Sequence, residues 1–181
     1  MKFVANVDFN GGQLRPLDKS DVDSIVKLYQ TQTLAGQSAS ASKEHAERMV
    51  ELSVQMAATQ RGLMWAIECD GAMLGMLSLY DWQPSSLKTL MRLDVMSELT
   101  EELQINALVA ALDYLSGKYH LRNFSFQCLP KGNESLISVL EKVGFTQKAC
   151  LRDFRRTSQT EYTDILLYNR ILDVAVSGEM Q

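Results

Sequence analysis

The chain has 181 residues, of which 46% are hydrophobic and 22% are charged, and its formal net charge is −4. This size and composition predict one domain, residues 1–181, with a substantial hydrophobic core. The negative charge argues against a nucleic-acid partner, because such binding requires clustered lysine and arginine.

Simple features exclude further classes. No run of ~18 apolar residues is present, so we expect no membrane-spanning helix, and the first residues are too polar for a signal peptide. Cys69, Cys128 and Cys150 are widely spaced and the two histidines lie far apart, which predicts no metal site. Cysteines without an obvious pairing are typical of a reducing compartment, so we expect a cytoplasmic protein.

The first third of the chain predicts one strand and two helices. Residues 13–17 form a short strand, and Ser20 can cap a helix whose apolar face includes Tyr29. Residues 34–41 are small and polar, which is typical of a loop. Ser42 can cap the second helix.

The middle of the chain predicts an antiparallel meander of three strands. Residues 63–69 and 73–82 flank Asp70-Gly71, which is a two-residue hairpin signal. Residues 89–96 alternate between apolar and charged side chains, as a half-buried third strand does.

The last part of the chain alternates helices and strands. A helix at residues 103–115 connects the strand at 89–96 to a strand at 124–130, and a crossover helix predicts that these two strands are parallel. A short amphipathic helix and two strands follow, at residues 133–144, 146–154 and 164–172. The order predicts an α/β (α+β) domain with a mixed, mostly antiparallel sheet of six to seven strands, flanked by about four helices.

Three short motifs follow one another along the chain. They are Leu14-Arg15-Pro16-Leu17 at the first strand, Asn133 followed by Val143-Gly144-Phe145, and the closing-strand pieces Leu151-Arg152 and Tyr162-Thr163-Asp164. In this order they resemble the GCN5-related N-acetyltransferase (GNAT) superfamily, and most of all its ribosomal-protein N-terminal acetyltransferase branch. The resemblance covers about residues 14–172, and it implies that superfamily's fold and acetyl transfer from acetyl-CoA to a primary amine of a small molecule or peptide.

The loop that binds the cofactor in this family is degenerate in this chain. The family's loop has the form Arg/Gln-x-x-Gly-x-Gly/Ala, in which glycine lets backbone N–H groups approach the pyrophosphate at a helix N-terminus. The matching window, residues 97–102, contains no glycine and no basic residue. Glu101 and Glu102 instead suit the first turn of a helix, but at about 4 Å each would repel a phosphate charge by ~4 kcal/mol at an effective dielectric constant of about 20.

The resemblance also implies which residues would meet acetyl-CoA. The backbone of Val95 and Met96 corresponds to the strand that polarises the thioester carbonyl. Thr100 and Ser135 correspond to the phosphate side, although Thr100 can also cap the helix and Ser135 stands one position before the family's serine. Asn133 is either a cofactor contact or a plain helix cap.

The chemistry requires a neutral amine, a polarised carbonyl and a proton for the leaving thiolate. Leu140 stands where many family members have a tyrosine that supplies this proton. Four carboxylates are candidate general bases, Glu68, Asp81, Asp94 and Glu98. We select Glu68 and Asp94, although strand carboxylates are more often simply solvated. Cys128 has no histidine nearby in sequence, so we expect a buried thiol rather than a nucleophile.

Two functions of different classes follow from these observations. The first is an acyl-CoA-dependent N-acyltransferase that works by direct transfer in a ternary complex, with a protein N-terminus as one candidate acceptor. The second is a non-catalytic binding module of the same fold, whose cofactor site is closed by Glu101 and Glu102. Exposed strand edges make a homodimer a reasonable expectation for either.

Overall fold

The computed structural model describes residues 4–31 and 42–173, so the loop predicted at residues 34–41 lies outside the described residues. The strands are β1 (Val7–Phe9), β2 (Gly12–Pro16), β3 (Leu63–Cys69), β4 (Ala72–Gln83), β5 (Lys88–Val95), β6 (Asn123–Cys128), β7 (Thr146–Arg156) and β8 (Tyr162–Ile171). The α-helices are α1 (Val22–Thr31), α2 (Lys43–Ala58), α3 (Glu101–Tyr119) and α4 (Glu134–Lys142), and short 3-10 turns occupy Lys19–Asp21 and Pro84–Ser86. No helix in these ranges is long and apolar enough to cross a membrane.

The strands form one sheet in the order β1-β2-β3-β4-β5-β6-β8-β7. The described part of the sheet has eight strands rather than the six to seven predicted, because β1 pairs antiparallel with β2 through Val7 and Leu14. An edge strand of three residues is too short to show an alternating pattern, which explains why the sequence did not reveal it. The predicted fold class and the four helices are confirmed.

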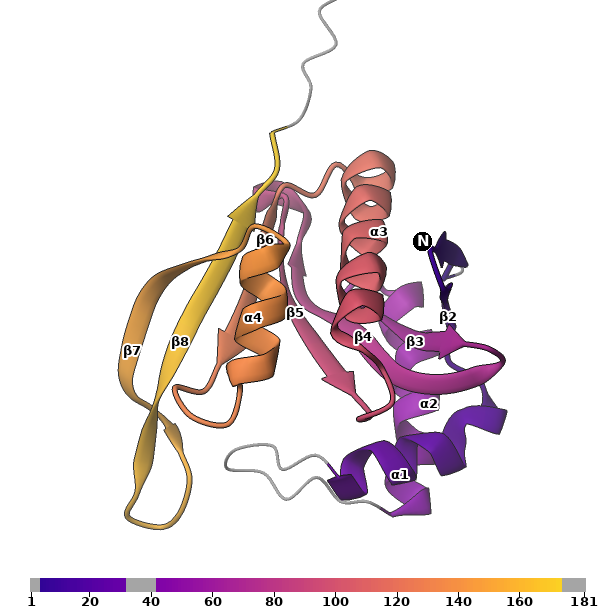
Figure 1. Ribbon diagram of the computed structural model, residues 1–181, viewed down its shortest axis with the longest axis horizontal. Helices are drawn as coiled ribbons and strands as arrows, with labels where there is room; N and C mark the ends of the chain where they lie inside the picture. Colours follow the sequence, from indigo (N-terminus) through magenta and orange to yellow (C-terminus); the bar gives the residue numbers. More distant parts are fainter. Residues whose placement is uncertain (1–3, 32–41, 174–181) are drawn as a thin grey trace, which may run out of the picture.

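The parallel contact between β5 and β6 is also confirmed, with Thr89 opposite Phe124. It covers only the first four residues of β5 and ends where Met91 lies opposite Phe126. Beyond this point the two strands diverge, as Figure 1 shows, and we call this opening the splay. The rest of β5 pairs with β4 on its other side.

Helices cover both faces of the sheet. Alternate residues of β3 belong to different hydrophobic clusters: Trp65 packs with residues of α3, whereas Met64 packs with residues of α1 and α2. Because strand side chains alternate between faces, α3 and α4 must cover one face, and α1 and α2 the other. The splay therefore lies between two helical layers, with α3 and α4 on one face of the sheet and α1 and α2 on the other.

Local capping explains where the helices begin. Ser42 caps α2 by accepting a hydrogen bond from the His45 backbone N–H at 3.1 Å, as predicted. Ser20 does not cap the first helical segment. Asp18 takes that role, since its carboxylate accepts from the Ser20 N–H at 2.6 Å and Asp21 returns the contact at the Asp18 N–H.

Two glycines fix the direction of the chain where the φ angle is positive. Asp70 and Gly71 both adopt positive φ, 50° and 76°, which is the two-residue turn predicted between β3 and β4. Gly144 follows α4 with a φ of 93° and directs the chain into β7. The predicted end of the short helix at Gly144 is therefore confirmed within two residues.

Candidate functional site

The backbone of β5 turns alternately toward its two neighbouring strands. The Met96 N–H donates to the Leu74 carbonyl on the β4 side at 2.8 Å. In an antiparallel pair, alternate residues direct their backbone groups to the partner, so Leu93 and Val95 direct theirs toward the splay. Of the two backbone positions predicted to meet acetyl-CoA, Val95 faces the splay, whereas the N–H of Met96 is occupied by β4.

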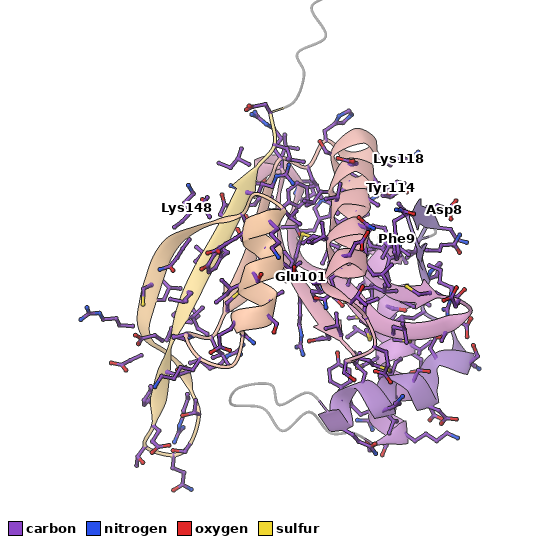
Figure 2. The ribbon with its side chains drawn as sticks, viewed as in Figure 1. Asp8, Phe9, Glu101, Tyr114, Lys118 and Lys148 are labelled. Atoms are coloured by element: carbon purple, nitrogen blue, oxygen red, sulfur yellow. The ribbon has the colours of Figure 1, made fainter. Side chains whose placement is uncertain are left out.

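The N-terminus of α3 lies at one end of the splay and carries the predicted cap. The Thr100 hydroxyl accepts from the Leu103 N–H at 3.4 Å, which confirms the capping role. Glu101 follows, and its carboxylate reaches across to α4, where it accepts a 3.0 Å hydrogen bond from Ser138 and pairs with the Lys142 ammonium. Figure 2 shows Glu101 between the ribbons of α3 and α4. We call this contact the α3–α4 bridge.

The charge of the α3–α4 bridge is largely balanced. The hydrogen bonds from Lys142 and Ser138 hold the pKa of Glu101 below its ordinary value. The Glu101 and Lys142 side chains are 45% and 54% exposed, so water and ions screen the pair. The repulsion that Glu101 was expected to exert on a cofactor phosphate is therefore reduced by Lys142, which lies 41 residues away in the sequence.

The other face of the splay holds a buried ionic cluster, which we call the Arg92 cluster. Arg92 and Asp94 alternate with Leu93 on β5 and point toward α1. The Arg92 Nε–H lies 2.8 and 3.0 Å from the two carboxylate oxygens of Asp94, and the Tyr29 hydroxyl donates to Asp94 at 3.0 Å. The Tyr29 ring lies under the guanidinium, with 5.8 Å between the Arg92 Cζ and the ring centroid.

The Arg92 cluster keeps its charge distribution fixed. Burial and the charge of Asp94 raise the pKa of Tyr29 well above its ordinary range, so the hydroxyl stays a donor. Burial lowers the pKa of Arg92, but the Asp94 carboxylate outweighs it and the net shift is upward. Arg92 therefore remains a cation and Tyr29 remains neutral across physiological pH.

The two predicted general bases lie in different places. Asp94 is 4% exposed and sits at the splay, although both of its oxygens already accept hydrogen bonds. Glu68 lies near the end of β3, two strands away from β5, where it pairs with Arg15 at 2.5 Å. Arg15 also binds Asp21, so this network ties β2 to the start of the helical segment. The structure brings Asp94 to the splay and does not bring Glu68 there.

Neither of the two polar residues predicted at the start of α4, Asn133 and Ser135, caps the helix with its side chain. Asn133 precedes α4, but its side chain caps no helical N–H. Its Oδ1 instead accepts from the Leu129 N–H at 2.7 Å and its amide donates to the Gly132 carbonyl, so it fixes the loop after β6. Ser135 is exposed, whereas Ser138, one turn later, faces α3.

Two further positions considered for acid or covalent chemistry, Leu140 and Cys128, are buried. Leu140, at the position of the family's tyrosine, is 0% exposed and packs in the core. Cys128, the last residue of β6, is also fully buried, and burial raises the pKa of its thiol to about 12. A thiol with this pKa is protonated at neutral pH, so Cys128 is a poor nucleophile, in agreement with the prediction. The described cysteines are all free, and no group of metal-ligating side chains occurs among the described residues.

Sequence reasoning missed four of the six side chains in the two contacts: Tyr29, Arg92, Ser138 and Lys142. Tyr29 was read as part of an apolar helix face, and Arg92 as the solvated side of a strand. Lys142 lies four residues after Ser138, so one helix face carries both, which is a signal that the sequence did contain. Nothing in the sequence linked Glu101 to that face or Tyr29 to Asp94, because these contacts join residues 41 and 65 positions apart.

Residues 13–146 match the family model described as "Acetyltransferase (GNAT) domain". The match spans more than half of the chain, and the chain therefore belongs to the GNAT acetyltransferase family. No curated protein sequence matches it significantly.

Several solved structures share the fold. RimL, titled a ribosomal L7/L12 alpha-N-protein acetyltransferase in complex with coenzyme A, superposes with a TM-score of 0.84 at 20% identity, over 93% of this chain and 99% of that one. Mycobacterium smegmatis RimJ, in complex with a CoA-disulfide, gives 0.78 at 19% identity over 93% and 86% of the two chains. The Microcin C7 self immunity acetyltransferase MccE, in complex with acetyl-CoA and AMP, gives 0.78 at 13% identity over 90% and 93%.

Proposed function

We propose that the chain is an acetyl-CoA-dependent N-acetyltransferase that transfers the acetyl group directly to a primary amine in a ternary complex. The observation that carries this proposal is the splay, where β5 leaves β6 after Met91 and turns the backbone of Leu93 toward the opening. Membership of the GNAT family and the fold shared with RimL and MccE support the same reaction.

The α3 side of the splay suits the phosphates of acetyl-CoA once the α3–α4 bridge yields. The Lys142 ammonium and the Ser138 hydroxyl are donors that now hold the Glu101 carboxylate, and a phosphate oxygen accepts the same donors. The first N–H groups of α3 add a favourable field for an anion. We infer that a cofactor phosphate replaces the carboxylate of Glu101, which swings outward, and that Lys142 and Ser138 take over the role of the missing glycine loop.

The β5 backbone and the α1 side complete the proposed site. When bound, acetyl-CoA supplies the acetyl thioester. The Leu93 N–H and carbonyl, directed into the splay, would orient it, and the neighbouring Val95 extends the same edge. Asp94 holds Arg92 and Tyr29 in place on the acceptor side. We assign no catalytic role to Glu68, because its carboxylate serves the Arg15 network.

Direct transfer is favoured over a covalent enzyme intermediate. Cys128, the last residue of β6, is fully buried, and its raised pKa keeps the thiol protonated. The amine itself must then attack the thioester, which requires that it lose its proton to solvent or to a nearby base before transfer. We further propose a peptide N-terminus as acceptor and a cytoplasmic location, which the free thiols at Cys69, Cys128 and Cys150 support. The homodimer stays a prediction.

A second candidate function rests on the same contact. If Glu101 stays bound to Lys142 and Ser138, the bridge joins α3 to α4 at the place where a phosphate would bind. The chain would then be a non-catalytic module of the GNAT fold.

One assay separates the two functions. Purified protein is incubated with acetyl-CoA and a mixture of primary amines that includes short peptides, and release of coenzyme A is measured together with the mass of the products. The enzyme hypothesis predicts acetylated amine and a raised melting temperature with acetyl-CoA alone. No product and no thermal shift at millimolar acetyl-CoA would leave the non-catalytic module as the function.

A further inference from the structure

Arg92 has a hydrogen-bonding group that the protein itself does not use. Its Nε–H is taken by Asp94, yet its Nη2 atom is shielded from solvent and has no hydrogen-bond partner in the part of the chain that the structure describes. Guanidinium groups carry five N–H donors in a rigid fork, and buried donors in folded proteins are nearly always paired. The ion pair with Asp94 uses only the Nε–H of this fork. The pair therefore does not explain why the N–H groups of Nη2 are buried.

The position of Arg92 points to a ligand on the acceptor side. It is the first residue of β5 after the last β5–β6 pair, Met91 opposite Phe126, and it precedes Leu93, whose backbone faces the splay. Its side chain is on the face opposite α3 and α4, next to Tyr29 of α1. The Arg92 side chain is 31% exposed, so an amine that approaches the Leu93 backbone from the α1 side would carry its neighbouring atoms past the guanidinium. The atoms that cover Nη2 in the free protein must shift for the acceptor to reach it.

The chemistry of the Arg92 cluster selects a neutral oxygen rather than an anion. Asp94 already balances the charge of Arg92, and an incoming carboxylate would also meet the negative charge of Asp94. A carbonyl oxygen accepts a hydrogen bond from Nη2 without that repulsion.

We propose that Arg92 is the specificity-determining residue for the acceptor, and that it donates a hydrogen bond from Nη2 to the carbonyl oxygen adjacent to the acceptor amine. This selects α-amino amides, including peptide N-termini, over simple alkylamines. Asp94 and Tyr29 are positioning residues, because they fix the plane of the guanidinium without touching the acceptor. The inference rests on the proposed acetyl transfer and adds the group that recognises the acceptor.

The test compares three acceptors of similar size in the wild-type protein: alaninamide, free alanine and isopropylamine. Rates are expressed per neutral amine, at saturating acetyl-CoA, so that differences in amine pKa do not enter. Loss of a hydrogen bond to a charged donor predicts a kcat/KM for alaninamide about 10- to 100-fold above that for isopropylamine, with alanine below alaninamide. The variant Arg92→Lys keeps the charge but lacks the fork, and should reduce the ratio to within about threefold, mainly through KM. Lys88→Gln, at the exposed start of β5, is the control and should keep the wild-type ratio.

The outcomes separate this inference from the proposed function. Transfer to all three amines with no preference in the wild type, or an unchanged preference in Arg92→Lys, overturns the role of Arg92 and leaves acetyl transfer standing. A preference for alanine over alaninamide shows recognition of a carboxylate and also overturns it. Absence of transfer to any amine overturns the proposed function and this inference together. The wild-type series measures the preference itself whether or not Arg92→Lys folds, and the comparison with Arg92→Lys assigns that preference to Arg92.

Discussion

The two ionic contacts on either side of the splay differ in how deeply they are buried. In the α3–α4 bridge, Glu101 and Lys142 are 45% and 54% exposed, whereas in the Arg92 cluster Asp94 is 5% exposed and Arg92 31%. Exposed ion pairs contribute about 0–1 kcal/mol and can exchange partners, but a buried pair is strongly destabilised when one partner is removed. The comparison teaches that the exposed α3–α4 bridge can exchange its partners, as the proposed cofactor side requires, while the buried Arg92 cluster is held in one arrangement.

The largest expected effect is on the buried side. Asp94→Ala leaves Arg92 without its counter-ion and Tyr29 without its acceptor, and should lower the free energy of unfolding by about 2–4 kcal/mol, allowing for the partial exposure of Arg92. Urea denaturation followed by circular dichroism measures this. Glu44→Ala, which removes an exposed partner of Arg48 on α2, is the control and should change stability by less than about 0.5 kcal/mol. Equal effects of the two variants would contradict the proposed difference between buried and exposed contacts.

The next effect tests the turn from α4 into β7. Gly144 has a φ of 93°, a region that side-chain-bearing residues rarely adopt, so Gly144→Ala should destabilise the protein by about 1–2 kcal/mol. Gly117 lies inside α3 with open space around the position of an added Cβ, and Gly117→Ala should be neutral or stabilise by up to about 1 kcal/mol. Thermal unfolding of the two variants measures both effects. A destabilising Gly117→Ala together with a neutral Gly144→Ala would contradict both predictions.

On the exposed side the main effect should be on ligand affinity rather than on stability. Lys142→Ala removes the cation assigned to the phosphates, so the Kd for acetyl-CoA should rise about 5- to 10-fold while the melting temperature of the free protein changes little. Lys118→Ala, in the last turn of α3 and at the opposite end of that helix from Glu101, is a control of equal charge and should leave the Kd within about twofold. If both variants weaken binding equally, only the net charge matters and Lys142 has no specific role.

The smallest effect is the pH dependence of the α3–α4 bridge. Lys142 and Ser138 depress the pKa of Glu101 below its ordinary value of 4.5, so the bridge is fully formed above that value and is lost as pH falls through the depressed folded-state value. An NMR titration of the Glu101 side chain should show a midpoint below 4.5 in the wild type. The midpoint should move upward in Lys142→Ala. A wild-type midpoint at or above the ordinary value would show that the contact does not persist in solution.

The sequence predicted those features that depend on neighbours along the chain. The caps at Ser42 and Thr100, the turn at Asp70-Gly71 and the parallel β5–β6 contact each follow from a local pattern or a connection rule, and each is observed. Local patterns failed where two neighbours compete for one role. Asp18 rather than Ser20 starts the first helical segment, because its carboxylate also completes a capping box with Asp21.

The site itself depends on contacts that no local pattern contains. The sequence placed Asp94 among the candidate bases, but not the two partners that occupy its oxygens, because Tyr29 comes from α1 and looked like a core residue. It indicated a repulsive charge at Glu101, but the compensating Lys142 comes from another helix. Asn133 shows the same limit, since its side chain turns back to Leu129 instead of capping α4.

The central claim is that Glu101 holds the place of a cofactor phosphate and gives way to it. Titration calorimetry with acetyl-CoA on the wild type, Glu101→Gln and Glu102→Gln tests this most directly. Glu102 is an exposed carboxylate in the same helical turn, so Glu102→Gln is a matched control. We predict that Glu101→Gln binds acetyl-CoA about 3- to 10-fold more tightly than the wild type, since it removes a competing charge, and that Glu102→Gln changes the Kd by less than about twofold. Unchanged or weaker binding by Glu101→Gln, or no heat from any of the three proteins at millimolar acetyl-CoA, would contradict the claim.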